Sequence, residues 1–174
     1  MARVYPRNLG EGKHLLTLER DLDYFSGVAA QQTGALEKAR GYWTVAASPL
    51  VEPGPHTYFQ ALALRALGDE EASCAALKRL GRFAEERAQE TPKIDYFATS
   101  LPNLLLFDDD LEKRNRIEST VLAALANHGL GASEKAVELL RQATAEDPNY
   151  LLALDALRWV TRAAELEPDA RPAS

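Results

Sequence analysis

The chain has 174 residues, of which 46% are hydrophobic, and carries a formal net charge of −6. This length is enough to bury one substantial core, or one core shared along an array of repeats, without division into separate domains. The acidic balance argues against nucleic acid or an anionic membrane as partner, because both need a surplus of Lys and Arg on one face.

The sequence shows neither a recognisable signal peptide nor a membrane-spanning segment. The first residues lack the apolar run of a signal peptide, and nowhere do about 18 uncharged apolar residues follow one another. The single cysteine, Cys74, lies among alanines in a helical pattern and is interpreted as a small packed residue. We therefore expect a cytoplasmic protein that does not enter a membrane.

Helical periodicity dominates the chain, because Ala and Leu alternate with Glu, Arg and Lys at helical spacing while alternating β-branched residues are scarce. Glycines and prolines separate the patterns, and Gly34, Gly68 and Gly131 each follow an apolar helix as its expected left-handed end. The predicted helices run over residues 18–32, 35–47, 56–67, 70–89, 110–128, 133–145 and 150–166.

These glycines also define a repeat, since Gly34 and Gly68 lie 34 residues apart, the period of a tetratricopeptide repeat (TPR). Small residues recur at fixed offsets in the first and third units, where two helices of a hairpin must approach closely. In the second unit the matching alanine of the second helix is displaced to Ala72. The positions in the first and third units are Gly27, Ala39, Trp43 and Ala46, and Ala124, Ala136, Leu140 and Ala143.

The fold prediction is therefore all-α, a right-handed α/α superhelix of TPR-like hairpins with an irregular helical insertion and a C-terminal capping helix. We expect an extended N-terminal segment over 1–16, one helical repeat domain over 17–166 and a disordered tail over 167–174. The insertion is placed at about residues 90–110, because 63 residues separate Gly68 from Gly131.

Several segments resemble the C-terminal TPR region of bacterial DUF5107-type proteins over roughly residues 5 to 155. The stretches that carry the resemblance are Asn8 to Leu16, Lys93 to Asp110 and Arg114-Asn115-Arg116-Ile117. In that family the helical region follows a β-rich domain similar to mutarotase-like folds. The resemblance implies a fragment or a short relative that keeps the helical part, and an uncharacterised function.

Candidate catalytic motifs are weak, so we expect no enzyme activity, cofactor or metal. Gly10-Glu11-Gly12-Lys13 lacks the first glycine and the Ser or Thr of a phosphate loop. Asp108, Asp109 and Asp110 could hold a cation or serve acid/base chemistry, but one of them is expected to cap the following helix. The histidines at 14, 56 and 128 show no zinc-ligand spacing.

The concave face of the predicted array is the candidate binding site for a protein, a peptide or a sugar. Alternatively, the chain's own segment 104–107 fills this groove. A chaperone-type carboxylate clamp is not expected, because Phe25, Phe59 and Leu122 stand where its polar residues would be. The predicted groove residues are Tyr24, Val28 and Gln31, then Tyr58, Leu62 and Arg65, and finally Glu118, Val121, Leu125 and His128.

Three functional hypotheses follow. The first is a non-catalytic protein-interaction scaffold. The second is an accessory module of a carbohydrate-active protein whose β-domain is encoded elsewhere. The third is a homodimer that pairs through the insertion or through Leu154, Leu157 and Trp159 of the last helix.

Overall fold

The computed structural model describes residues 18–90 and 110–166, and these two ranges contain seven α-helices. The all-α prediction is thereby confirmed for the described residues, and each predicted helix end lies within two residues of the observed one. The segments 1–17, 91–109 and 167–174, which include the predicted insertion and tail, lie outside the described residues. The helices are α1 (Arg20–Gln32), α2 (Leu36–Ala46), α3 (Pro55–Ala66), α4 (Glu70–Gln89), α5 (Leu111–Gly129), α6 (Ser133–Glu146) and α7 (Leu151–Leu166).

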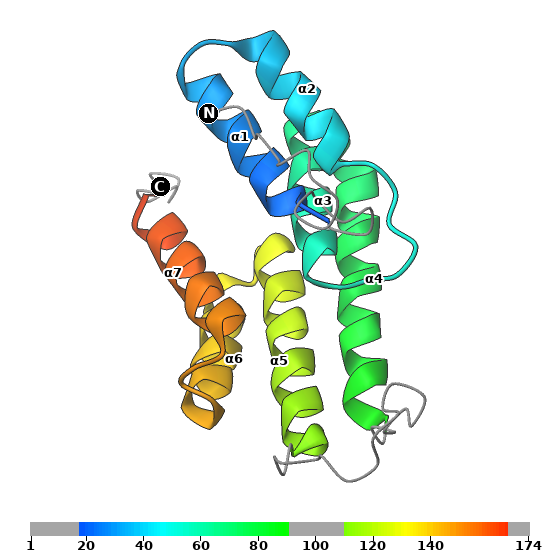
Figure 1. Ribbon diagram of the computed structural model, residues 1–174, viewed down its shortest axis with the longest axis vertical. Coiled ribbons are helices and arrows are strands. Elements are labelled where there is room, and N and C mark those ends of the chain that lie inside the picture. The colour runs from blue at the N-terminus through cyan, green and yellow to red at the C-terminus, as the bar shows by residue number, and fades with distance from the viewer. Residues whose placement is uncertain (1–17, 91–109, 167–174) are drawn as a thin grey trace, which may run out of the picture.

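Consecutive helices pack as antiparallel hairpins, α1 with α2, α3 with α4 and α5 with α6 (Figure 1). The odd-numbered helices also contact one another in order, α1 with α3, α3 with α5 and α5 with α7. Within the described residues, α2, α4 and α6 contact only their neighbours in sequence. We call α1, α3, α5 and α7 the inner layer, because these helices lie against each other without an intervening helix.

Three turns of identical construction close the hairpins. Gly34, Gly68 and Gly131 have φ angles of 76°, 93° and 89°, the left-handed conformation that a side chain disfavours, so the predicted helix ends are confirmed. In each turn the residue after the glycine donates its N–H to the carbonyl five residues earlier, at 2.9 Å. These bonds join Ala35 to Ala30, Asp69 to Leu64, and Ala132 to Asn127.

The turn glycines set a register that the buried residues follow in all three hairpins. The residue five positions after each glycine is small and fully buried, namely Ala39, Ser73 and Ala136. Ala72 is only half-buried, so the prediction that it takes this place in the second hairpin is wrong. Ser73 is small enough for the same close approach, and the second hairpin therefore keeps the register of the others.

Side-chain caps begin the two longest helices. Asp69 accepts a hydrogen bond from the N–H of Ala72 at 2.9 Å, and Asp110 accepts one from Lys113 at the same distance. The cap that was expected from the aspartate triplet is therefore confirmed for Asp110. Asp108 and Asp109 lie outside the described residues.

The first hairpin depends on contact between an indole ring and a bare backbone. Trp43 of α2 lies against Gly27 of α1, where an added Cβ atom would be 2.3 Å from Nε1 of the indole. The same nitrogen donates a hydrogen bond to the carbonyl of Tyr24 at 3.3 Å. Ala39, Ala46 and Ala63 complete this small core.

We expect Gly27→Ala to lower the free energy of unfolding by about 1–3 kcal/mol, because the new methyl group would overlap a rigid ring. Gly41→Ala is the matched control, since Gly41 lies inside α2 with nothing within 4 Å of an added Cβ atom. This control should raise stability by about 0.5–1 kcal/mol, as alanine favours a helix over glycine. Chemical denaturation followed by circular dichroism measures both. A Gly27→Ala protein as stable as the parent would show that the contact is loose.

Ser73 offers a second stability test, because its hydroxyl is buried and has no hydrogen-bond partner among the described residues. Ser73→Ala should raise the free energy of unfolding by about 1 kcal/mol, since it removes an unsatisfied polar group and keeps the small volume. Ser26→Ala is the control, because the Ser26 hydroxyl donates to the carbonyl of Leu22 at the surface. Loss of stability in Ser73→Ala would mean that the hydroxyl has a partner in solution.

Candidate binding surface on the inner layer

The predicted groove residues all lie on α1, α3 and α5, three helices of the inner layer, but they differ in exposure. Gln31 is exposed, and Tyr24, Val28, Leu62, Arg65, Glu118 and His128 are half-buried. Tyr58, Val121 and Leu125 lie in the core, because α5 packs against both α3 and α7. Their side chains therefore offer no surface to a partner.

Tyr58 and His128 join α3 to α5 through a hydrogen bond. The Tyr58 hydroxyl lies 2.7 Å from Nδ1 of His128, and the two ring centroids are 5.9 Å apart. Burial raises the pKa of the Tyr58 hydroxyl well above its ordinary value, and nearby Tyr24 adds to the effect. Tyr58 therefore stays neutral, and this pair acts as a structural link between two helices.

The charged residues of the predicted groove are likewise engaged in internal contacts. Arg65 donates to the carbonyl of Gly129 at 2.9 Å and pairs with Glu70 at 3.1 Å, so it ties α3 to α5 and α4. Glu118 pairs with Arg87 of α4 at 2.8 Å. These contacts hold neighbouring helices together and leave fewer charges available to recognise a ligand.

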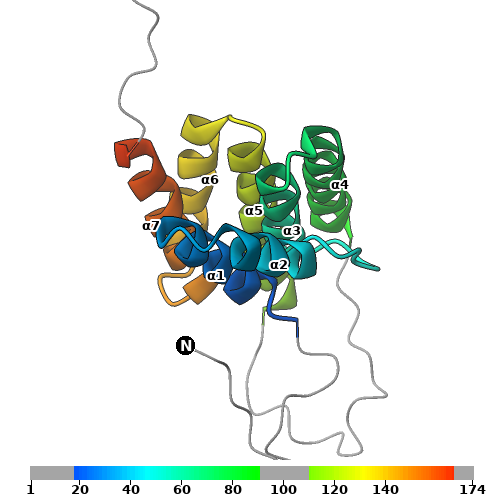
Figure 2. The same cartoon turned by 90° about the horizontal axis from the view of Figure 1, so that it is seen from above.

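An aromatic cluster occupies the middle of the inner layer. Phe25 of α1, Phe59 of α3 and Trp159 of α7 lie with ring centroids 5.5–5.9 Å apart. Such tilted and edge-to-face contacts stabilise aromatic pairs. Seen from above, α7 consequently lies beside α1, although the two helices are at opposite ends of the described chain (Figure 2).

Trp159 illustrates what sequence reasoning missed. Its ring packs against Phe25 and Phe59 within the chain, a contact that the sequence analysis did not predict, while the dimer through the last helix stays a prediction. No local pattern could have shown this, because the contacts join residues at least a hundred positions apart.

A row of large apolar side chains remains exposed beside this cluster. Leu22 and Phe25 of α1 are 46% and 42% exposed, and their spacing of three residues places them on one side of the helix, while Leu18, which is 45% exposed, lies two residues before α1 begins. We call these three residues the α1 stripe. Phe25 connects the stripe to the aromatic cluster, so the two features form one apolar surface.

Across 18–90 and 110–166, no three His, Cys, Asp or Glu side chains gather closely enough to hold a metal ion. None of the helices in these ranges combines the length and the apolar character that crossing a membrane requires.

No protein-family model matches the chain, and no solved structure matches it significantly.

We expect Tyr58→Phe to lower the free energy of unfolding by about 1 kcal/mol, because it removes a partly buried hydrogen bond to His128. Tyr42→Phe is the control, since Tyr42 is exposed on α2. This control should change stability by less than about 0.5 kcal/mol. Equal effects of the two substitutions, measured by urea denaturation, would refute the role of the Tyr58 hydroxyl.

Proposed function

We propose that the chain is a TPR-like protein-interaction scaffold that binds an apolar segment of a partner protein along the α1 stripe. Three features support the TPR-like interpretation: the 34-residue spacing of two turn glycines, the common register of buried residues, and the contacts between successive odd-numbered helices. Arrays of this kind commonly present their inner helices to peptides and helices of other proteins.

The α1 stripe is the observation that carries the proposal. A single exposed leucine is ordinary at a protein surface, but here Leu22 and Phe25 lie on one side of α1 and exposed Leu18 stands just before the same helix. The aromatic cluster beside the patch fixes the Phe25 ring from behind, which limits the entropy lost when a partner binds. The surface therefore suits an amphipathic helix whose apolar residues repeat every three to four positions.

The residues predicted from the sequence take two roles in this proposal. Tyr24 contacts both Phe25 and Phe59 and supports the stripe from within, while Gln31 at the end of α1 offers an exposed amide to the partner. Arg65, Glu118 and His128 maintain the spacing of the inner helices through their internal contacts. Recognition thus rests on α1, and the other inner helices provide its support.

The test uses peptides selected for binding to the whole chain from a displayed library, with affinities measured by fluorescence anisotropy. Leu22→Glu should weaken the selected peptides about tenfold or more, since one buried leucine contributes about 1.5–3 kcal/mol. We choose Leu22 because it lies outside both buried clusters, so the fold should survive its replacement.

Val45→Glu is the matched control, because Val45 is similarly exposed but lies on α2. It should leave the affinity unchanged. Equal weakening by both substitutions, or by neither, would place the binding surface elsewhere, and circular dichroism would verify that both proteins are folded.

A further inference from the structure

A second surface of different chemistry lies between α4 and the C-terminal end of α5. A hollow of about 580 Å³ opens there, and Lys135 from the first turn of α6 borders it. Three of its lining residues, Ala75, Gly81 and Ala126, are among the smallest side chains, which explains why the surface is recessed. We call this hollow the α4/α5 groove.

Close helix packing produces the shape of the groove. A Cβ atom added at Gly81 would lie 3.7 Å from the Cβ atom of Ala126, an ordinary contact distance, so α4 and α5 approach each other with little between them. Leu77 is fully buried beneath the groove, and Leu130 is 44% exposed at its edge. The base of the groove is therefore lined by small and apolar side chains.

Positive charge surrounds this apolar base. Lys78, Arg82 and Lys135 line the groove and are exposed, and Glu85 is the one acidic residue among the lining residues. Within the described part of the chain, none of the three cations forms an ion pair or a hydrogen bond, whereas Arg65, Arg87 and Arg116 all pair with glutamates. A local excess of unpaired cations thus stands in a chain whose net charge is −6.

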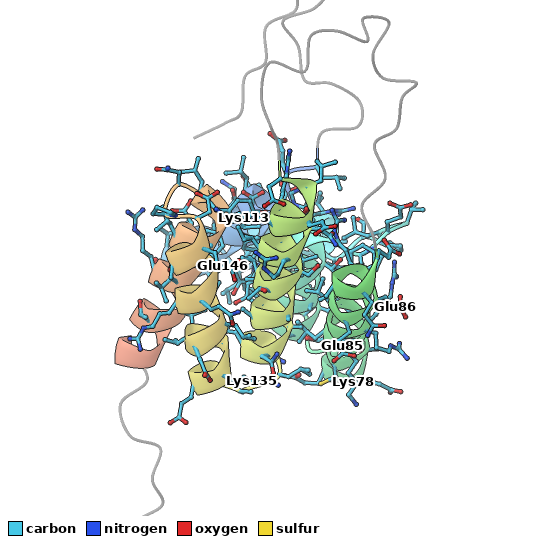
Figure 3. All side chains as sticks on the ribbon, turned by 90° about the horizontal axis from the view of Figure 1, so that it is seen from below. Lys78, Glu85, Glu86, Lys113, Lys135 and Glu146 are labelled. Atoms are coloured by element: carbon cyan, nitrogen blue, oxygen red, sulfur yellow. The ribbon has the colours of Figure 1, made fainter. Side chains whose placement is uncertain are left out.

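The cations border the groove from two helices, α4 and α6. Lys78 and Arg82 are four residues apart and therefore lie on the same side of α4. Figure 3 shows Lys78 and Lys135 at the same end of the groove, with α5 between them.

We propose that the α4/α5 groove binds an acidic segment of a partner protein. Asp or Glu side chains of that segment pair with Lys78, Arg82 and Lys135, and an apolar side chain contacts Leu130. Asn127 also lines the groove; its amide nitrogen donates to the carbonyl of Ala123, which leaves the amide oxygen to accept an N–H from the bound segment.

Charge complementarity selects this occupant over other anions. Nucleic acid needs an extended basic surface, whereas this groove has three cations and an acidic neighbour in Glu85. A single phosphate or small carboxylate needs convergent donors, but these cations lie on two different helices and are open to solvent. An acidic peptide can use separated charges and the apolar base together.

The first experiment is a nuclear magnetic resonance titration of the whole chain with a short peptide in which Glu alternates with Leu. The backbone signals of Gly81, Ala126, Asn127 and Leu130 should shift, and those of the α1 stripe should not. The same peptide with Gln in place of Glu should bind at least about tenfold more weakly, because it cannot form the charge-assisted pairs. Shifts confined to the inner layer, no binding at all, or equal binding of the Gln peptide would overturn the proposal.

Charge reversal then tests the residues. The double substitution Lys78→Glu with Lys135→Glu should weaken the Glu peptide about tenfold or more, since each exposed pair is replaced by repulsion. Two controls for net charge use residues that are exposed on α2: the single substitution Lys38→Glu, and the double substitution Lys38→Glu with Arg40→Glu. Both should have little effect on the affinity. If the controls weaken binding equally, the groove does not recognise the peptide.

Inorganic phosphate and a short RNA serve as competitors, and displacement by either at the peptide's own concentration would refute a peptide-specific site.

Discussion

In the first hairpin the Trp43 indole rests on the backbone of Gly27, where a Cβ atom would come within 2.3 Å of the ring. The second and third hairpins meet through a contact of the same kind, since a Cβ atom at Gly129 would lie 2.4 Å from a methyl group of Leu77. Close approach at positions without side chains therefore determines both how one hairpin forms and how two hairpins join. These close approaches set the distance between neighbouring helix axes. Large side chains can then fill the space between the helices, because the axes are already close.

This constraint also accounts for the two surfaces of different character. Successive odd-numbered helices contact one another, and the Trp159 ring of α7 packs against Phe25 of α1 and Phe59 of α3. At the other surface, Gly81 and Ala126 allow α4 and α5 to meet without filling the hollow above them. The apolar surface that remains on the inner layer is thus displaced to the edge of α1, whereas the α4/α5 groove stays open and charged.

Local chemistry made most of the fold predictable from the sequence. Helix ends depend on nearby residues. The sequence therefore predicted the helix ends at Gly34, Gly68 and Gly131 and the helix start at Asp110. Ser73 was not predicted at this position, because an alanine was expected there, although the packing requires only a small side chain. The resemblance to DUF5107-type proteins and the insertion at about 90–110 stay predictions, since the latter lies outside the described residues.

The candidate sites were less predictable because they depend on distant contacts. A helical register could place Tyr58 and Leu125 on the inner layer, but it could not tell that neighbouring helices bury them. The four-residue spacing of Lys78 and Arg82 predicts that they share one side of α4. The presence of Lys135 at the same groove depends on how α6 packs, which the sequence does not show.

An acidic chain with a basic groove raises the question of whether its overall charge would repel the proposed acidic partner. The screening length at physiological ionic strength is about 8 Å, so exposed charges farther than this from a bound segment act on it only weakly. Lys78, Arg82 and Lys135 would instead act at contact distance, where charge-assisted hydrogen bonds form. Their attraction is therefore felt in the complex, while the repulsion from the net charge of −6 acts mainly on the approach. It follows that the chain's acidity should slow association more than it weakens the bound state, and that this slowing should be greatest at low ionic strength.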